Sequence, residues 1–173
     1  MPWSTVLDRF LTLILFPAAN PEFIPTLIPI GLGLVTIELY FGKYAFEDLG
    51  WNSAVSNSVL IIATATTLIV RLNLLDLPPA GPRALVAYGI LVLGLAILLL
   101  NFYHVWPPEI AFNVSSGFVA YTTVYLAIVT VYTGIPIDGS TAAAWGIFAL
   151  GLYVLFKLLK RLPGTAEPRR GGW

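Results

Sequence analysis

The sequence predicts an all-α integral membrane protein, in which a bundle of about five transmembrane helices follows a short N-terminal amphipathic helix at the interface. Three observations predict this fold class. Of the 173 residues, 58% are hydrophobic and only 10% are charged. The mean hydropathy is +0.86, and long apolar stretches alternate with short segments that contain proline, glycine and charge. Soluble domains carry about 25% charged residues, so this chain has too few to cover a globule in water.

Composition also excludes several classes of site. The chain contains no cysteine, which excludes disulfides, thiolate metal sites and cysteine nucleophiles. His104 is the single histidine, so a metal site built from several histidines is excluded as well. The 9 basic and 9 acidic residues cancel, whereas a nucleic-acid partner requires clustered positive charge. Because no phosphate-binding glycine loop or nucleophile motif is present, we expect no cofactor, no metal and no catalytic activity.

Three parts follow one another along the chain: an N-terminal segment (1–17), a transmembrane domain (18–162) and a polar C-terminal tail (163–173). A helix needs roughly 20 apolar residues to cross the hydrocarbon core of a bilayer. Apolar stretches of suitable length are separated by turn-forming segments such as LPPAGP and TGIPIDGS. The expected transmembrane helices cover residues 22–42, 52–75, 83–103, 118–132 and 141–162.

The N-terminal segment has the pattern of an amphipathic helix. Its polar residues recur at helical spacing and are Thr5, Asp8, Arg9 and Thr12. The apolar stretch is too short to cross a bilayer, and Pro17 is expected to end the helix. We therefore expect this helix to lie in the membrane interface. A short half-inserted helix packed on the bundle is the alternative.

The expected helix 52–75 carries one polar stripe. Its members recur at helical spacing and are Ser53, Asn57, Thr64, Thr67 and Arg71. Because an asparagine is costly in lipid, we expect the stripe, including Asn57, Thr64 and Thr67, to be buried against other helices or to line a hydrated path. The first alternative requires only hydrogen bonds between helices. Arg71 can extend to the lipid headgroups or pair with Asp76.

A second polar group is expected at one side of the membrane. Glu38 is the only acidic residue well inside an apolar stretch, and helix connectivity brings other polar residues to a similar depth. The expected cluster is Glu38, Ser53, Asn57, Asn101 and His104. A carboxylate beside an imidazole suits a proton-linked site, since histidine titrates near neutral pH. A hydrogen-bonded belt among interfacial tyrosine and tryptophan side chains is the alternative.

The last expected helix carries small residues on one face, namely Ala142, Gly146 and Ala149. Faces of this kind let helix backbones approach closely, either within one chain or between subunits. The sequence therefore predicts a helix-packing surface here.

Basic residues predict the orientation. With five spans, Lys43 lies on the same side as Lys157, Lys160, Arg161, Arg169 and Arg170. Arg9, Arg71 and Arg83 lie on the opposite side. Cytoplasmic loops carry an excess of lysine and arginine, so we expect a multi-pass protein with a cytoplasmic C-terminus. Asn113 begins a glycosylation sequon, which this topology would leave unused on the cytoplasmic side.

Three functions remain compatible with these patterns. The first is a non-catalytic structural, assembly or interaction subunit, which associates in the lipid bilayer with a protein partner or with copies of itself. The second is a small transporter or channel, with a polar path along helix 52–75 and Glu38 as its ionisable residue. The third is an intramembrane enzyme. The short loops leave no room for a soluble catalytic domain, so we expect the first.

Overall fold

The computed structural model describes residues 2–43, 50–74 and 81–159. All regular secondary structure in these ranges is helical, which confirms the expected class. A helix occupies each of the five expected ranges as far as they are described, whereas residue 75, residues 160–162 and the expected tail 163–173 lie outside the described residues. The elements are α1 (Trp3–Ala19), the 3-10 turn η1 (Pro21–Phe23), α2 (Ile24–Lys43), α3 (Trp51–Leu74), α4 (Pro82–Phe102), α5 (Pro108–Val114), α6 (Gly117–Thr133) and α7 (Gly139–Leu159).

Four helical stretches in the described part of the chain are long and apolar enough to cross a membrane. They are Trp51–Asn73, Pro82–Phe102, Pro108–Thr133 and Gly139–Leu159. The chain is therefore a multi-pass membrane protein by helix length and hydropathy. The expectation of about five spans is met for four, because α2 contributes only the shorter apolar stretch Ile30–Tyr40.

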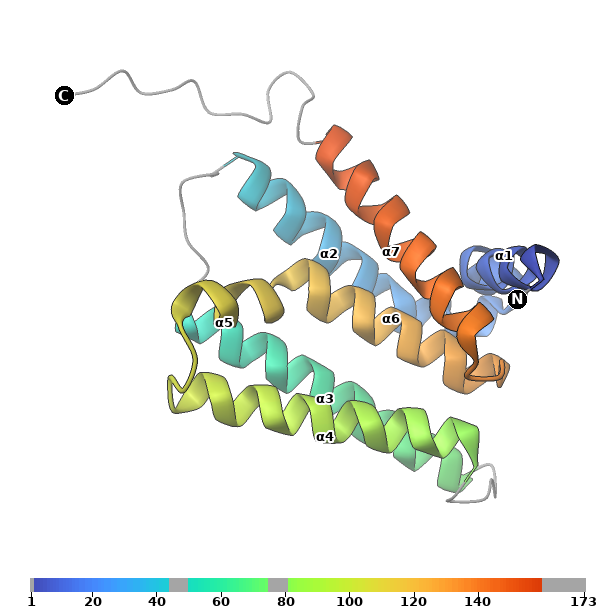
Figure 1. The fold of residues 1–173 in the computed structure, drawn as a ribbon, viewed down its shortest axis with the longest axis horizontal. Coiled ribbons are helices and arrows are strands. Elements are labelled where there is room, and N and C mark those ends of the chain that lie inside the picture. Colours follow the sequence, from blue (N-terminus) through green and yellow to red (C-terminus); the bar gives the residue numbers. More distant parts are fainter. Residues whose placement is uncertain (1, 44–49, 75–80, 160–173) are drawn as a thin grey trace.

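α6 forms the centre of the bundle (Figure 1). The antiparallel pair α3 and α4 packs on one side of it, and α2 and α7 lie on the other. Small and β-branched side chains allow this close packing, and the buried ones include Ala120, Val124, Ala127, Val129 and Val131. The spans differ in how much of their most apolar part is buried. The buried share is 56% for the stretch formed by α5 and α6, and only 11% for α7. Few residues of α7 are therefore buried against the other described helices.

α1 continues beyond Pro17 to Ala19, so the expectation that Pro17 ends this helix is wrong. A proline has no N–H, and the carbonyl of Leu13, one turn earlier, loses its usual helical partner. The Tyr125 hydroxyl of α6 donates to this carbonyl instead, at 2.6 Å. A donor from a neighbouring helix thus allows α1 to tolerate the proline.

α1 crosses the end of the bundle near the start of α7, where Figure 1 shows it almost end-on. It has three faces. The face packed on the bundle contains Val6, Leu13 and Phe16. An apolar face that stays exposed contains Trp3, Leu7, Leu11 and Ile14. The polar face with Asp8 and Arg9 remains at least partly exposed. α1 is therefore amphipathic and docked at the same time, which combines features of both alternatives considered for it.

The segment before α6 forms a helix that the sequence analysis did not anticipate. α5 begins at Pro108, a favoured residue for the first helical turn, and Glu109 adds an acidic side chain there. Ser116 then caps α6 by accepting a hydrogen bond from the Val119 N–H at 3.4 Å. This helix–turn–helix places Ser115 at the junction, facing α3 and α4.

Candidate functional site

The most developed polar site surrounds Asn101, which is fully buried at the end of α4. Its Nδ2 donates to Ser115 Oγ at 2.8 Å, to Ser58 Oγ at 3.1 Å and to the Ala54 carbonyl at 3.2 Å. Its Oδ1 accepts from Trp106 Nε1 at 2.8 Å. We call these residues, together with Asn57, the Asn101 network. Protein groups thus bind both the nitrogen and the oxygen of the Asn101 amide.

Asn57 extends this network from α3 to the α5–α6 junction. Its Nδ2 donates to the Ser115 carbonyl at 2.7 Å. Ser115 is therefore bound twice, through its backbone by Asn57 and through its hydroxyl by Asn101. These hydrogen bonds connect α3, α4 and the α5–α6 junction. Polar side chains connect neighbouring membrane helices in this way.

His104 performs a backbone role at the end of α4. Its φ of 52° lies in the left-handed region, where glycine is the usual residue. The His104 N–H bonds to the Asn101 carbonyl at 3.2 Å, and the Val105 N–H bonds to Leu100 at 2.9 Å, which together form a Schellman cap. The imidazole is exposed and stacks on Trp51, with ring centroids 3.9 Å apart.

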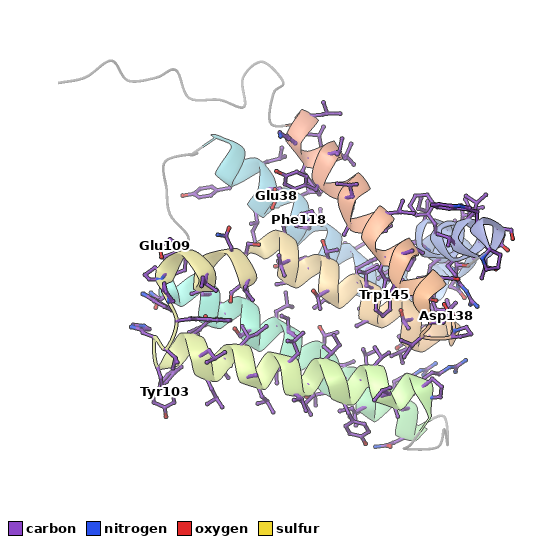
Figure 2. All side chains as sticks on the ribbon, in the orientation of Figure 1. Glu38, Tyr103, Glu109, Phe118, Asp138 and Trp145 are labelled. Carbon is purple, nitrogen blue, oxygen red and sulfur yellow. The ribbon has the colours of Figure 1, made fainter. Side chains whose placement is uncertain are left out.

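Glu38 lies near the C-terminal end of α2 (Figure 2) and is only 9% exposed. Leu27 and Leu34, which precede it at helical spacing, are buried on the same face. The structure therefore groups Asn57 with Asn101, whereas Glu38 belongs to a different helix and to a face that packs on its neighbours.

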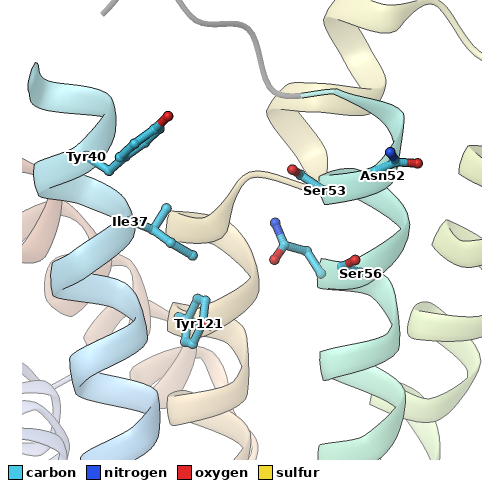
Figure 3. Close-up of a pocket in the computed structure, with 7 residues that line it drawn as sticks. Ile37, Tyr40, Asn52, Ser53, Ser56 and Tyr121 are labelled. Carbon is cyan, nitrogen blue, oxygen red and sulfur yellow. The ribbon is translucent and has the colours of Figure 1, made fainter. Parts of the chain in front are cut away.

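A cavity of about 470 Å³ separates α2 from the first two turns of α3, and we call it the Tyr121 cavity. Figure 3 shows Ile37 and Tyr40 on one wall, with Tyr121 of α6 between the two helices. The opposite wall is polar and contains Asn52, Ser53, Ser56 and Asn57. Glu38 is not part of this lining, although Ile37 beside it is.

A second cavity, of about 170 Å³, lies further along the same helices, and we call it the Tyr132 cavity. Its lining is Ile30, Ala63, Thr64, Thr67, Leu68, Ile128 and Tyr132. Arg71 follows, with its guanidinium carbon 5.6 Å from the centroid of the Tyr132 ring. The polar stripe of α3 thus runs along the side of the helix that faces α2 and α6.

The members of this stripe differ in burial. Asn57 and Thr64 are half-buried, whereas Thr67 is exposed. The expectation that all three are buried is therefore wrong for Thr67. Its hydroxyl donates to the Ala63 carbonyl at 2.9 Å, so its polar group is satisfied within α3 and needs no second helix.

The small-residue face of α7 is open. Ala142 and Gly146 are exposed, and Ala149 is half-buried. A Cβ added to Gly146 would meet no atom within 4 Å, and the same holds for Gly151. This face is therefore not used for packing between the described helices of the chain.

Sequence reasoning missed Ser58, Ser115 and Trp106, although each binds Asn101. Ser58 and Ser115 lie 43 and 14 residues away from Asn101 in the chain. No local spacing links residues so distant. Within the described ranges, no group of three or more histidine, cysteine or acidic residues is placed to hold a metal ion. Comparisons with protein-family models, curated proteins and solved structures found no match to this chain.

Proposed function

We propose that this protein is a non-catalytic membrane component that associates with another membrane protein or with a second copy of itself through the outer face of α7. The observation that carries this proposal is the open space around Gly146. Membrane helices associate through small residues that let backbones approach closely. Gly146 stands between Ala142 and Ala149 at helical spacing, so the open surface has room for a neighbouring helix.

Other glycines of the chain show how such space is filled. A Cβ added to Gly33 would meet the Tyr121 ring, and one added to Gly94 would meet Ile62. A Cβ added to Gly117 would likewise meet the Ile37 side chain. Helix contacts in this protein therefore use glycine to admit a large side chain. Gly146 has the same capacity, and the occupant comes from another chain.

The proposal includes five spans and a cytoplasmic C-terminus. α2 has 20 residues, which corresponds to about 30 Å at a rise of 1.5 Å per residue and equals the thickness of the hydrocarbon core. α2 also packs along α6, which is itself a membrane span. These two facts support α2 as the fifth span, with α1 in the interface at its N-terminal side.

Mass measurement in mild detergent tests the association. The unmodified protein should have a mass above that of one chain, as an oligomer or with a co-purifying protein. Gly146→Leu should return it to the mass of a monomer, because the leucine fills the space that the partner helix requires.

Gly89→Leu is the matched control. Gly89 on α4 is equally open, but its neighbours at helical spacing are Leu85 and Leu93 rather than small residues. This variant should keep the mass of the unmodified protein. A monomeric unmodified protein without partners, or an equal effect of both substitutions, would contradict the proposal.

A second candidate, transport along α3, is favoured by the two cavities that its polar stripe lines. The Tyr121 and Tyr132 cavities follow one another between α2 and α3, and both contain hydroxyl or amide groups. In this proposal Glu38, a buried acid next to the Tyr121 cavity lining, is the ionisable residue.

Flux into liposomes tests this second candidate. Glu38→Gln keeps the shape of the side chain and removes its titration, so a pH-dependent flux should be lost. Glu109→Gln is the control, since Glu109 is an exposed acid on α5. If the unmodified protein carries no flux under proton or cation gradients, or if both variants behave alike, Glu38 has no transport role.

A further inference from the structure

Arg71, in the last turn of α3, carries a buried side-chain nitrogen. Its Nε is buried, and no acceptor for it is found among the residues that the structure describes. The guanidinium instead lies over the Tyr132 ring at a cation–π distance of 5.6 Å. Asp76, the acidic residue that the sequence offers as a partner for Arg71, lies outside the described residues. A buried donor without an acceptor is unfavourable, so a further acceptor at this guanidinium would stabilise the site.

The Tyr132 cavity lies next to this guanidinium. Tyr132 contributes to the cavity lining, and its ring also contacts Arg71. The other lining residues are apolar, apart from Thr64 and Thr67. Because the Thr67 hydroxyl is bonded to its own helix, an occupant meets mostly hydrocarbon. The site therefore combines one cationic end with an apolar trough.

The depth of the site matches the architecture of a phospholipid. Arg71 lies close to the end of the span Trp51–Asn73, at the level of the headgroups. Ala63, in the cavity lining, lies eight residues earlier, about 12 Å deeper along the helix. A phospholipid also has its phosphate at the surface and its acyl chains directed inward.

Two guanidinium groups lie at this end of the bundle, which also carries the acidic residues Asp8 and Asp138. The Arg83 guanidinium lies against Gly134, directly after α6, and so adds a second positive charge at the same helix end. Asp138, an acidic residue near this end, accepts a hydrogen bond from the Thr141 N–H and caps α7. The planar fork of an arginine binds phosphate oxygens in pairs, with better geometry than an ammonium group.

We propose that Arg71 binds the phosphate of a glycerophospholipid and that part of one acyl chain of the same molecule occupies the Tyr132 cavity. Tyr132 holds the guanidinium in place through the face of its ring. Thr64, Leu68 and Ile128 contact the acyl chain. This lipid site lies between α2, α3 and α6 and does not depend on the association proposed for α7.

Lipid titration of the full, delipidated protein in mild detergent tests the site. The probes are dioleoyl phosphatidylglycerol, dioleoyl glycerol with the same acyl chains and no phosphate, and inorganic phosphate alone. The thermal unfolding midpoint and the number of lipids retained in native mass spectra are measured. Phosphatidylglycerol should raise the midpoint and be retained, and the other two probes should do neither.

Two variants separate the two halves of the site. Arg71→Gln should weaken phosphatidylglycerol binding about tenfold or more, because a charge-assisted hydrogen bond is lost. Thr64→Leu fills the cavity while leaving Arg71 intact and should also reduce the retained lipid, so the proposal remains testable if Arg71→Gln does not fold. Arg9→Gln is the control, since Arg9 lies on the polar face of α1 and should leave lipid binding unchanged.

Three results would overturn the proposal. An equal shift with dioleoyl glycerol would show that the phosphate is not recognised. A shift with inorganic phosphate alone would show an anion site rather than a lipid site. Equal losses in Arg71→Gln and Arg9→Gln would show that lipid retention depends only on overall charge.

Discussion

At the scale of single residues, Tyr125 compensates for a defect that Pro17 introduces into α1. Leu13 is fully buried, and its carbonyl has the Tyr125 hydroxyl as partner at 2.6 Å. We expect Tyr125→Phe to lower the free energy of unfolding by about 1–3 kcal/mol, because this carbonyl would stay buried without a donor. Chemical denaturation in detergent would measure the change.

Tyr121→Phe provides the control for this prediction. Tyr121 lies one turn earlier on α6, its ring packs against Gly33, and its hydroxyl donates no hydrogen bond to a residue in the described ranges. Its variant should stay close to the unmodified protein. Equal stability of the Tyr125→Phe variant would mean that α1 tolerates Pro17 for another reason.

Asn101 is the second residue whose removal should be costly. Asn101→Leu would remove the donor to Ser58 Oγ and Ser115 Oγ and the acceptor of the Trp106 indole N–H. We expect a loss of at least about 1–3 kcal/mol, the cost of one buried polar group without a hydrogen bond. Asn113→Leu is the control, because Asn113 is exposed and bonds only to the Glu109 carbonyl within α5. Similar thermal midpoints for both variants would contradict the structural role of Asn101.

At the scale of helical elements, the start of α7 depends on a charged cap. Asp138 Oδ1 accepts a hydrogen bond from the Thr141 N–H at 2.9 Å, the third residue of the helix. This backbone hydrogen bond holds the pKa of the Asp138 carboxyl below its ordinary value of 3.8. Arg9 on α1 adds a smaller electrostatic contribution in the same direction.

The sign of the resulting pH dependence follows from this lowered pKa. The ionised cap stabilises the fold above pH 3.8, and the contribution is lost as the pH falls through the lower pKa of the folded state. Asp138→Asn keeps a capping side chain at neutral pH and should lose this acid-dependent part. Thermal midpoints measured from neutral pH to pH 2 test it, with Asp8→Asn as the exposed acidic control. Identical acid profiles for the Asp138→Asn variant and the unmodified protein would refute the role of the charge.

At the scale of the whole molecule, the proposed topology makes a prediction about sidedness. In the topology proposed from the basic residues, the C-terminal tail is cytoplasmic and the loop between α6 and α7 lies outside, on the side of α1. Reporter fusions at Gly172 and within 134–138 should therefore report opposite sides. An active external reporter at Gly172 would invert the orientation and expose Asn113 for glycosylation. If both reporters lie on the same side of the membrane, α7 does not cross it.

Local features of the sequence predicted much of the fold. The lengths of the apolar stretches located the helices, because a bilayer core sets how many residues a span needs. The spacing of the polar residues of α3 predicted that they share one face, and the cavities that they line follow α3. Pro17 shows the limit of such rules: it ends a helix only when the freed carbonyl finds no other donor.

The site depended on information that no local pattern contains. Helical periodicity determined which side chains lie together on one helix, since the backbone geometry is fixed at 3.6 residues per turn. Only the tertiary structure decided which helices are neighbours, and with them the hydrogen-bond partners. Tyr125 binds a carbonyl 112 residues away, and Asn57 binds one 58 residues away. The sequence alone therefore determined a membrane bundle with polar faces, while the packing around α6 decided that Asn101 is tied into a network and that α7 keeps an open face.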